Sequence, residues 1–274
     1  HEMIYKVNGK NKKICLSNNE GSNQAVFSKT LKYFINTHSS INTPHKVTTN
    51  NNSGKVLSTL IDNKELIDRL AQFNMPTKEF FTFETTDGVK LNGWMIKPHN
   101  FDAGKKYPVI QFQYSGPYSQ QVTDNWYIGN YGNAMFESYM AAEGFIMVCV
   151  DGRGTGGRGT DFGKCTYLNI GKYEPHDQVE AAKYLGTLPY VDKERIGIWG
   201  WSFGGYNTIM SMSQDEAVFK AGVAVAAPTD WRFYDTIYTE RYMRTPKENK
   251  DGYDNGSAIV NANKLNGHLL LIHG

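Results

Sequence analysis

Residues 195–205 read RIGIWGWSFGG, and this stretch decides the fold class of the chain. It joins an apolar run, residues 196–199, to the pattern Gly-x-Ser-x-Gly at residues 200–204, which a helix-like segment follows. A serine on so sharp a turn between strand and helix is held in a strained conformation that exposes its hydroxyl, and glycine neighbours relieve the crowding. The amino end of the next helix directs N–H groups toward a developing oxyanion. The pattern predicts a nucleophile elbow with Ser202 as the nucleophile.

On both sides of this turn, apolar strands alternate with helices. Continuous apolar runs are typical of strands buried on both faces, and such alternation predicts a mostly parallel sheet covered by helices, an α/β fold. Asp87-Gly88 is the expected turn of a hairpin formed by residues 80–84 and 90–96. The expected strands are residues 80–84, 90–96, 109–113, 145–150, 196–199, 221–226 and 268–272, and the expected helices are residues 135–143, 175–185 and 205–212.

The first 62 residues have a different pattern, with short β-like segments separated by Asn, Gly and Ser clusters. The segments are residues 3–7, 13–16, 33–37 and 45–49, and Asn8-Gly9 is a hairpin-turn signal. They predict a sheet of about four strands, such as one β-propeller blade, although a small accessory β-subdomain fits equally well. An amphipathic helix over residues 63–72 follows, and Met75-Pro76 ends it. We therefore expect two domains, residues 1–75 and residues 76–274.

Composition excludes several classes of protein. The 274 residues include 29 Lys+Arg and 27 Asp+Glu, and a net charge of +2 argues against a nucleic-acid binder built on a basic surface. The apolar runs are far shorter than the ~20 residues that span a bilayer. Residues 1–10 contain no charged start followed by an apolar stretch, so we expect no signal peptide among them. The cysteines, Cys15, Cys149 and Cys165, lack the spacing of a disulfide scaffold or zinc site, so we expect no metal and no cofactor.

The catalytic triad is expected to be incomplete in this chain. In this fold class the order along the chain is Ser, then acid, then His, and only His268 and His273 follow Ser202. Both flank the final predicted strand and are expected to be strand-edge residues, while His176 precedes the serine and suits a helix cap. The acidic residues available after the serine include Asp215, Asp230, Asp235, Asp251 and Asp254.

Several separated motifs agree in order and spacing with one family. The chain resembles the dipeptidyl peptidase IV group of the prolyl oligopeptidase family, in a bacterial, Bacteroidetes-like form. The resemblance implies an α/β-hydrolase catalytic domain, cut before the triad acid and histidine, preceded by the last blade of a β-propeller. The segments are residues 62–66 (DNKEL), 75–76 (MP), 114–120 (YSGPYSQ), 151–156 (DGRGTG), 200–206 (GWSFGGY), 218–220 (VFK), Trp231 with Tyr234, 237–243 (IYTERYM) and 269–274 (LLLIHG).

The same resemblance implies a serine exopeptidase that releases amino-terminal dipeptides with Pro or Ala in second place. Ser202 would be acylated, and the backbone N–H of Phe203 and the hydroxyl of Tyr114 would form the oxyanion hole. From the residues alone, Tyr114 would be a strand-end aromatic and the pocket aromatics would be ordinary core. The residues implied to line the proline pocket are Phe203, Pro228, Trp231, Tyr234 and Tyr238.

This sequence departs from the family in four respects. Phe203 stands where tyrosine is frequent, and Pro228 replaces a β-branched pocket residue. The family's triad acid and histidine would follow Gly274, and the residues that bind the substrate's amino end would precede His1. This chain alone is therefore expected to be inactive.

Alternatives remain open within and beyond this family. The chain could be a prolyl tripeptidyl aminopeptidase, a prolyl oligopeptidase or an acylaminoacyl peptidase, or a non-catalytic hydrolase-like binding protein. The Gly-rich residues 151–159 lack the ending of a P-loop, so nucleotide binding is a weak alternative. The resemblance further implies peptide substrates, a possible homodimer, and a periplasmic, cell-surface or secreted location. No nucleic-acid partner and no membrane span are expected.

Overall fold

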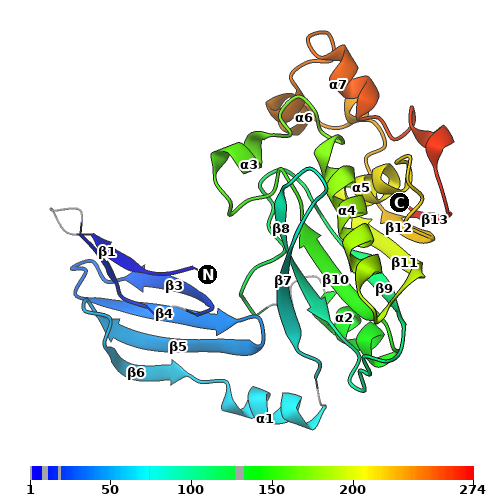
Figure 1. Cartoon of the computed structure of the whole chain (residues 1–274). Helices are drawn as coiled ribbons and strands as arrows, with labels where there is room; N and C mark the ends of the chain where they lie inside the picture. Colours follow the sequence, from blue (N-terminus) through cyan, green and yellow to red (C-terminus); the bar gives the residue numbers. More distant parts are fainter. Residues whose placement is uncertain (1, 8–11, 18–19, 74, 127–132) are drawn as a thin grey trace. The chain divides into compact units, whose positions relative to one another are not determined.

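In the computed structural model, the chain divides into two compact units (Figure 1). The smaller unit consists of His1–Lys78 and Thr123–Ser138, and the larger of Glu79–Val122 and Tyr139–Gly274. The larger unit contains the predicted elbow. The predicted Asn8-Gly9 turn lies outside the described residues. The structure describes residues 2–7, 12–17, 20–73, 75–126 and 133–274.

The smaller unit is built from antiparallel strands. A four-stranded sheet has the order β3-β4-β5-β6, and β1 and β2 pair separately. The predicted segments 3–7 and 13–16 became this separate pair, whereas β3 and β6 were not predicted. Neither shows simple alternation: β3 buries its polar start, and β6 is exposed along its length. The strands are β1 (Tyr5–Val7), β2 (Lys13–Cys15), β3 (Ser22–Phe27), β4 (Tyr33–Ser40), β5 (Thr43–Asn51) and β6 (Val56–Ile61).

The larger unit contains the predicted α/β sheet. Its seven strands have the order β13-β12-β11-β9-β10-β8-β7. Neighbouring strands from β13 to β10 are parallel, while β8 runs antiparallel to β10. The sheet is therefore mixed but mostly parallel, as expected. Its strands are β7 (Lys78–Glu84), β8 (Lys90–Ile96), β9 (Tyr107–Phe112), β10 (Ile146–Asp151), β11 (Val191–Trp201), β12 (Ala221–Val225) and β13 (His268–Ile272).

Helices α4 and α5 pack on the sheet beside β11 (Figure 1). The sequence missed α6, which is only eight residues long and rich in β-branched and aromatic residues. A cap initiates it: the Asp235 carboxylate accepts a hydrogen bond from the Tyr238 N–H at 2.8 Å. The α-helices are α1 (Lys64–Gln72), α2 (Asn133–Ala142), α3 (Thr160–Lys164), α4 (Tyr173–Thr187), α5 (Phe203–Met212), α6 (Thr236–Met243) and α7 (Lys250–Asn255), and the 3-10 helices are η1 (Trp231–Phe233) and η2 (Ala262–Lys264).

The central strands are apolar because both of their faces are covered. All six residues of β10 are buried, and Ile146, Val148 and Val150 join Leu185 of α4 in one core cluster. Burying one such side chain fully contributes about 1.5–3 kcal/mol. This double coverage confirms the interpretation of that apolar run as an interior strand. For residues 268–272 the same interpretation was wrong, because β13 is an edge strand of the sheet and four of its five residues are exposed.

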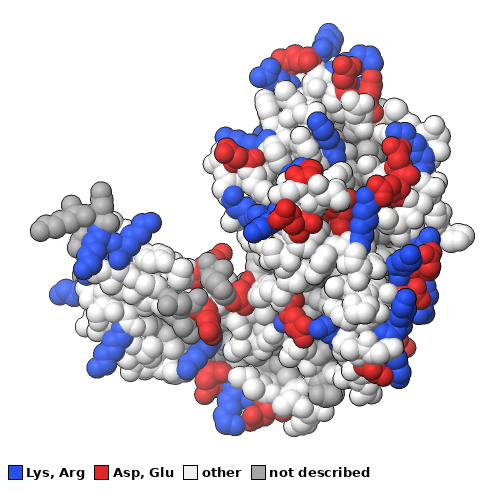
Figure 2. Space-filling view, in the orientation of Figure 1, with Lys and Arg blue, Asp and Glu red and all other residues white. Residues whose placement is uncertain are grey.

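Charged side chains of both signs are interspersed on the face of the larger unit seen in Figure 2. This distribution agrees with the near-balance of acidic and basic residues in the sequence. Within the described part of the chain, no helix combines the length and apolar character needed to cross a membrane.

Glu174, in the first turn of α4, is one of several polar or charged side chains buried in the interior. Its side chain is fully buried, and its Oε2 accepts a hydrogen bond from the Gly171 N–H at 3.0 Å. Burial raises the pKa of this carboxyl to about 8, and the hydrogen bonds from backbone N–H groups only partly oppose the shift. The folded protein therefore holds the proton of Glu174 more tightly than the unfolded chain does.

We expect this buried carboxyl to make folding stability depend on pH. Its contribution is fully present below the ordinary pKa of 4.5 and is lost as the pH rises through about 8. The substitution Glu174→Gln removes this titration. The free energy of unfolding of the variant, relative to the wild type, should therefore rise across this interval, by at most about 1.4 kcal/mol per pH unit. Urea denaturation at a series of pH values measures the difference.

The exposed Glu143 provides a matched control, since Glu143→Gln changes the same group at the surface. The rise predicted for Glu174→Gln is the part of its pH profile that exceeds the profile of Glu143→Gln. Parallel pH profiles for the Glu174→Gln variant and the wild type would show that Glu174 does not hold its proton as described.

Candidate active site

Ser202 occupies a sharp turn between β11 and α5. Its backbone angles are φ 57° and ψ −117°, a conformation that side-chain-bearing residues rarely adopt. Such strain costs of order 1–3 kcal/mol and requires support from the surrounding structure. The support comes from two hydrogen bonds: the Ser202 N–H donates to the Val225 carbonyl at 2.8 Å, and the Ser202 carbonyl accepts from the Tyr206 N–H at 3.0 Å. The turn thus has the geometry of a nucleophile elbow.

The positions on either side of Ser202 require glycine because a Cβ there would collide with neighbouring backbone atoms. A Cβ on Gly200 would lie 2.6 Å from the carbonyl oxygen of Gln113, and a Cβ on Gly204 would lie 2.5 Å from the same atom. Neither glycine has a positive φ. At Gly204 the crowding therefore comes from another strand, because Gln113 directly follows β9. At Gly200 the backbone of Gly204, within the turn itself, is equally close, at 2.5 Å.

Tyr114 reaches the elbow from that same strand end. Its side chain is half-buried, its Cα lies beside Gly204 of the turn, and its phenol interacts with the Ser202 side chain. Burial raises the pKa of Tyr114 above its ordinary value of 10, and the contact with Ser202 lowers it in part. The phenol is therefore protonated at neutral pH and can donate a hydrogen bond beside the serine.

An aromatic cluster lies next to these two residues. The Phe203 ring is 6.2 Å from Tyr114 and 5.4 Å from Trp231, measured between ring centroids. Trp231 is in turn 5.7 Å from Tyr234 and 5.9 Å from Tyr238. Trp231 and Phe203 are buried, whereas 42% of Tyr234 is exposed. The structure therefore brings together the aromatic residues that the resemblance assigned to the pocket.

Pro228 directly follows Ala227, which belongs to the same buried cluster as Phe203 and Trp231. Pro228 is half-buried in the connection between β12 and η1. Tyr242, which sequence reasoning did not single out, lies 5.0 Å from Tyr238. The four-residue spacing of Tyr234, Tyr238 and Tyr242 could have indicated one helical face, had the helix been predicted.

The acidic residues considered from the sequence have structural partners or lie at the surface. Asp230 caps η1 by accepting from the Arg232 N–H at 2.8 Å, and Asp235 caps α6. Asp254 forms an ion pair with Arg232. Asp215 and Asp251 are exposed.

The histidines that follow the serine lie at opposite ends of β13. His268 begins the strand, and His273 follows its end, at the same sheet edge as Ser202. The His273 Nδ1 lies 2.8 Å from the Gly274 carbonyl oxygen. His176 on α4 contacts Asp177, which raises its pKa. Among the described residues, no hydrogen bond joins a histidine to Ser202.

The Gly-rich residues 151–159 serve as a scaffold. The Asp151 carboxylate accepts hydrogen bonds from the N–H groups of Gln121 and Val122, at 2.9 and 2.8 Å, and burial raises its pKa to about 6. The Gly154 and Gly156 N–H groups donate to backbone carbonyls. A phosphate cradle needs such N–H groups to be available, so their use here argues against nucleotide binding.

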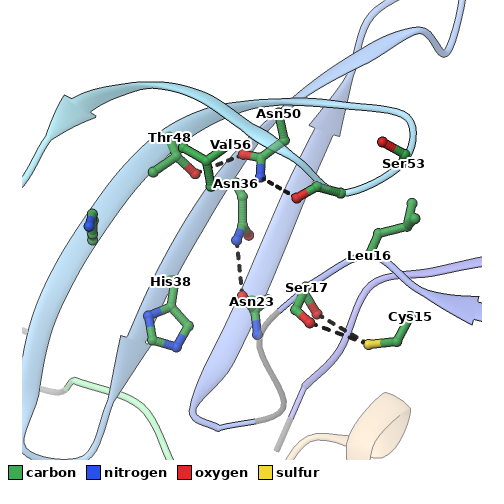
Figure 3. Close-up of a pocket in the computed structure, with 12 residues that line it drawn as sticks. Cys15, Leu16, Ser17, Asn23, Asn36, His38, Thr48, Asn50, Ser53 and Val56 are labelled. Atoms are coloured by element: carbon green, nitrogen blue, oxygen red, sulfur yellow. Dashed lines mark hydrogen bonds between the residues drawn. The ribbon is translucent and has the colours of Figure 1, made fainter.

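The smaller unit contains a polar pocket of about 460 Å³ (Figure 3). Asn36 donates to Asn23 at 3.0 Å, and Thr48 donates to Asn50 at 2.7 Å, so the lining groups largely satisfy one another. The pocket does not combine an activated nucleophile with a hydrogen-bonded base. Across the described residues, no group of three or more His, Cys, Asp or Glu side chains is placed to hold a metal ion. The elbow is therefore the stronger candidate site.

The sequence profile of the prolyl oligopeptidase family matches residues 134–274. The chain belongs to the prolyl oligopeptidase family. A crystal structure of Porphyromonas gingivalis dipeptidyl peptidase 4 is similar, with a TM-score of 0.94 and 48% identity, covering 99% of this chain and 38% of that chain. These findings agree with the resemblance and with the α/β-hydrolase fold expected from it.

Fungal members of the prolyl oligopeptidase family are also similar to this chain. A curated protein of Chaetomium globosum, named "Probable dipeptidyl-aminopeptidase B", is 44% identical over 264 aligned positions, covering 94% of this chain. A protein of the same name from Podospora anserina is 42% identical over 280 positions, covering 99% of this chain. The chain spans only 28% and 29% of the lengths of these two relatives.

The close approach at the elbow predicts the effect of a single methyl group. In the prolyl oligopeptidase elbow, Gly204→Ala should force the end of β9 away from the turn and lower the free energy of unfolding by about 1–3 kcal/mol. The control is Gly104→Ala, at an exposed glycine where an added Cβ would lie 3.3 Å from its nearest neighbour, the side-chain atom Asp102 Oδ1. It should change stability by no more than about 0.5 kcal/mol. Equal effects in denaturant titrations would contradict the steric explanation.

Proposed function

We propose that this chain is part of a serine exopeptidase that releases amino-terminal dipeptides with Pro or Ala in second place. The observation that carries the proposal is the placement of the Tyr114 hydroxyl beside Ser202 on a strained elbow. Relatives named dipeptidyl peptidase 4 and dipeptidyl-aminopeptidase B support the same activity.

In the proposed reaction, the Ser202 Oγ attacks the carbonyl carbon that follows the second substrate residue. Its proton passes to a histidine, which we propose lies outside this chain together with its acidic partner. The tetrahedral oxyanion accepts hydrogen bonds from the Phe203 N–H and the Tyr114 hydroxyl. Collapse of the intermediate breaks the C–N bond, and the leaving amine takes up the proton. Water then hydrolyses the acyl-enzyme and releases the dipeptide.

The aromatic cluster suits the proposed substrate. A proline ring is rigid, apolar and without an N–H group, so aromatic walls can contact it without leaving a donor unsatisfied. Phe203 and Trp231 would form the buried wall, and Tyr234, which is partly exposed, would lie at the mouth with Tyr238. Pro228 is proposed to bound the same pocket and to tune its width.

The wider organisation is also a proposal. Residues 1–75 would be the last blade of a propeller with its linker, and residues 76–274 would be most of the catalytic domain. The antiparallel four-stranded sheet supports the first assignment. We propose an exported enzyme, periplasmic or at the cell surface, that acts on peptides and can form a homodimer.

The test uses the full-length protein that contains this chain. It should hydrolyse glycyl-prolyl-p-nitroanilide, and a fluorophosphonate should add one adduct that Ser202→Ala abolishes. Tyr114→Phe should lower kcat about 10²–10³-fold with little change in KM, because one oxyanion donor is lost. Tyr118→Phe, at a half-exposed tyrosine on the following loop, is the matched control and should have no such effect.

Other outcomes would identify the alternatives. Cleavage of a tripeptidyl substrate but not of the dipeptidyl one would indicate a tripeptidyl aminopeptidase, and cleavage of an N-acetylated substrate would indicate an acylaminoacyl peptidase. Absence of both hydrolysis and adduct would reject the peptidase and favour a non-catalytic binding protein.

A further inference from the structure

A network of hydrogen bonds joins buried amide and hydroxyl groups beneath the elbow. It begins on β9, where the Gln111 Nε2 donates to the Gln178 Oε1 of α4 at 2.6 Å. The Gln178 Nε2 then donates to the Ser115 Oγ at 3.2 Å, and the Ser115 hydroxyl donates to the Gln113 Oε1 at 3.0 Å. From Gln113 the hydrogen-bond network continues to α5. It thus links three elements that are far apart in the sequence.

Gln113 is the centre of this hydrogen-bond network. Its side chain is fully buried, and its Nε2 donates to the Gly204 carbonyl at 2.7 Å and to the Thr208 Oγ1 at 3.1 Å. Its Oε1 accepts from the Asn207 Nδ2 at 3.0 Å and from the Ser115 hydroxyl. A glutamine amide has two donor hydrogens and two acceptor lone pairs, so every hydrogen-bonding site of this amide is used. Three of its four partners belong to α5, the helix that Ser202 precedes.

Ser115 is held in an unusual backbone conformation. Its φ of 63° lies in the left-handed region, which favours glycine, and the residue is only 1% exposed. Two hydrogen bonds of its hydroxyl, to Gln113 and from Gln178, fix this residue against the surrounding elements. The same buried hydrogen-bond network therefore holds Ser115 in its strained backbone conformation.

Tyr114 lies between these two fixed residues. On one side, the Gln113 amide binds α5 while the Gln113 carbonyl occupies the space left by Gly200 and Gly204. On the other side, Ser115 turns the chain sharply. The backbone of Tyr114 is thus clamped to the helix whose amino end carries Ser202, so the phenol and the serine hydroxyl share one support.

We propose that Gln113 is a positioning residue, which fixes the Tyr114 hydroxyl relative to Ser202 by binding the strand end to α5. This inference rests on the proposed function, because Tyr114 acts there as an oxyanion donor. Gln113 itself does not touch the substrate. Losing its amide would leave the Asn207 Nδ2 and the Ser115 hydroxyl without their acceptor in a buried setting, and the strand end could then shift. A shift of about 1 Å at a reacting group can cost on the order of 10² in rate.

The experiment is a double-mutant cycle in the full-length protein with glycyl-prolyl-p-nitroanilide. Gln113→Leu should lower kcat about 10–100-fold while KM changes less than about threefold. In the Tyr114→Phe background the same substitution should cost less than about threefold, because the hydroxyl that it positions is already absent. Ser115→Ala removes the neighbouring link with a smaller change in volume and should show the same dependence on Tyr114.

The control is Thr85→Val, which removes a buried hydroxyl that donates to Asp87 at 2.6 Å in the turn between β7 and β8. It should lower the melting temperature without lowering kcat. If Gln113→Leu does not fold, the Ser115→Ala cycle decides the proposal. Full additivity with Tyr114→Phe, or an equal loss of kcat in the Thr85→Val variant, would overturn it.

Crystal structures provide a readout that does not depend on peptidase activity. The proposal expects the Tyr114 phenol to be displaced from Ser202 in the Gln113→Leu variant, or in Ser115→Ala if the first does not fold. An unchanged phenol position would overturn the proposal even in an active enzyme. If the wild type lacks peptidase activity, the proposed function fails, and the phenol position still decides whether Gln113 positions Tyr114.

Discussion

The approach of one strand end to one turn constrains the whole candidate site. The Gln113 carbonyl lies so close to the elbow that residues 200 and 204 have no room for a side chain. Because β9 and β11 are neighbours in the sheet, their carboxyl ends meet at the same edge. The glycines of the Gly-x-Ser-x-Gly pattern thus make possible the contact that brings Tyr114 to Ser202. A bulkier elbow would separate the proposed nucleophile from its proposed oxyanion donor.

Buried polar groups make this contact specific. An apolar core could place the strands beside one another, but it would define their relative position less sharply than a fully satisfied hydrogen-bond chain. Gln113 uses all four of its hydrogen-bonding sites, and Asp151 holds the loop beyond Tyr114 through two backbone N–H groups. The site is therefore fixed on both sides of Tyr114. Glu174 is a different case, since its burial costs free energy once it ionises.

Sequence reasoning succeeded for features that depend on neighbouring residues. The apolar runs identified the interior strands, although the same pattern was wrong for the exposed edge strand β13, and the elbow motif located the strained serine. It failed where the local pattern was weak: β3 and β6 of the smaller sheet lack alternation, and α6 is short and rich in β-branched and aromatic residues. The aromatic residues near the elbow entered through a family resemblance, since their spacing alone is equally typical of ordinary core.

Local pattern was thus sufficient for the α/β class, the order of its interior strands along the chain, and the position of the elbow at Ser202. Composition and motif spacing carry this information because buried strands and tight turns restrict the residues within them. The partnership of Gln113 with Asn207, 94 positions away in the chain, could not be inferred in this way. The same is true of the phenol of Tyr114 beside Ser202 and of the buried Glu174 carboxyl. These features depend on which distant segments the sheet order places side by side, and that order arises from packing of the whole domain.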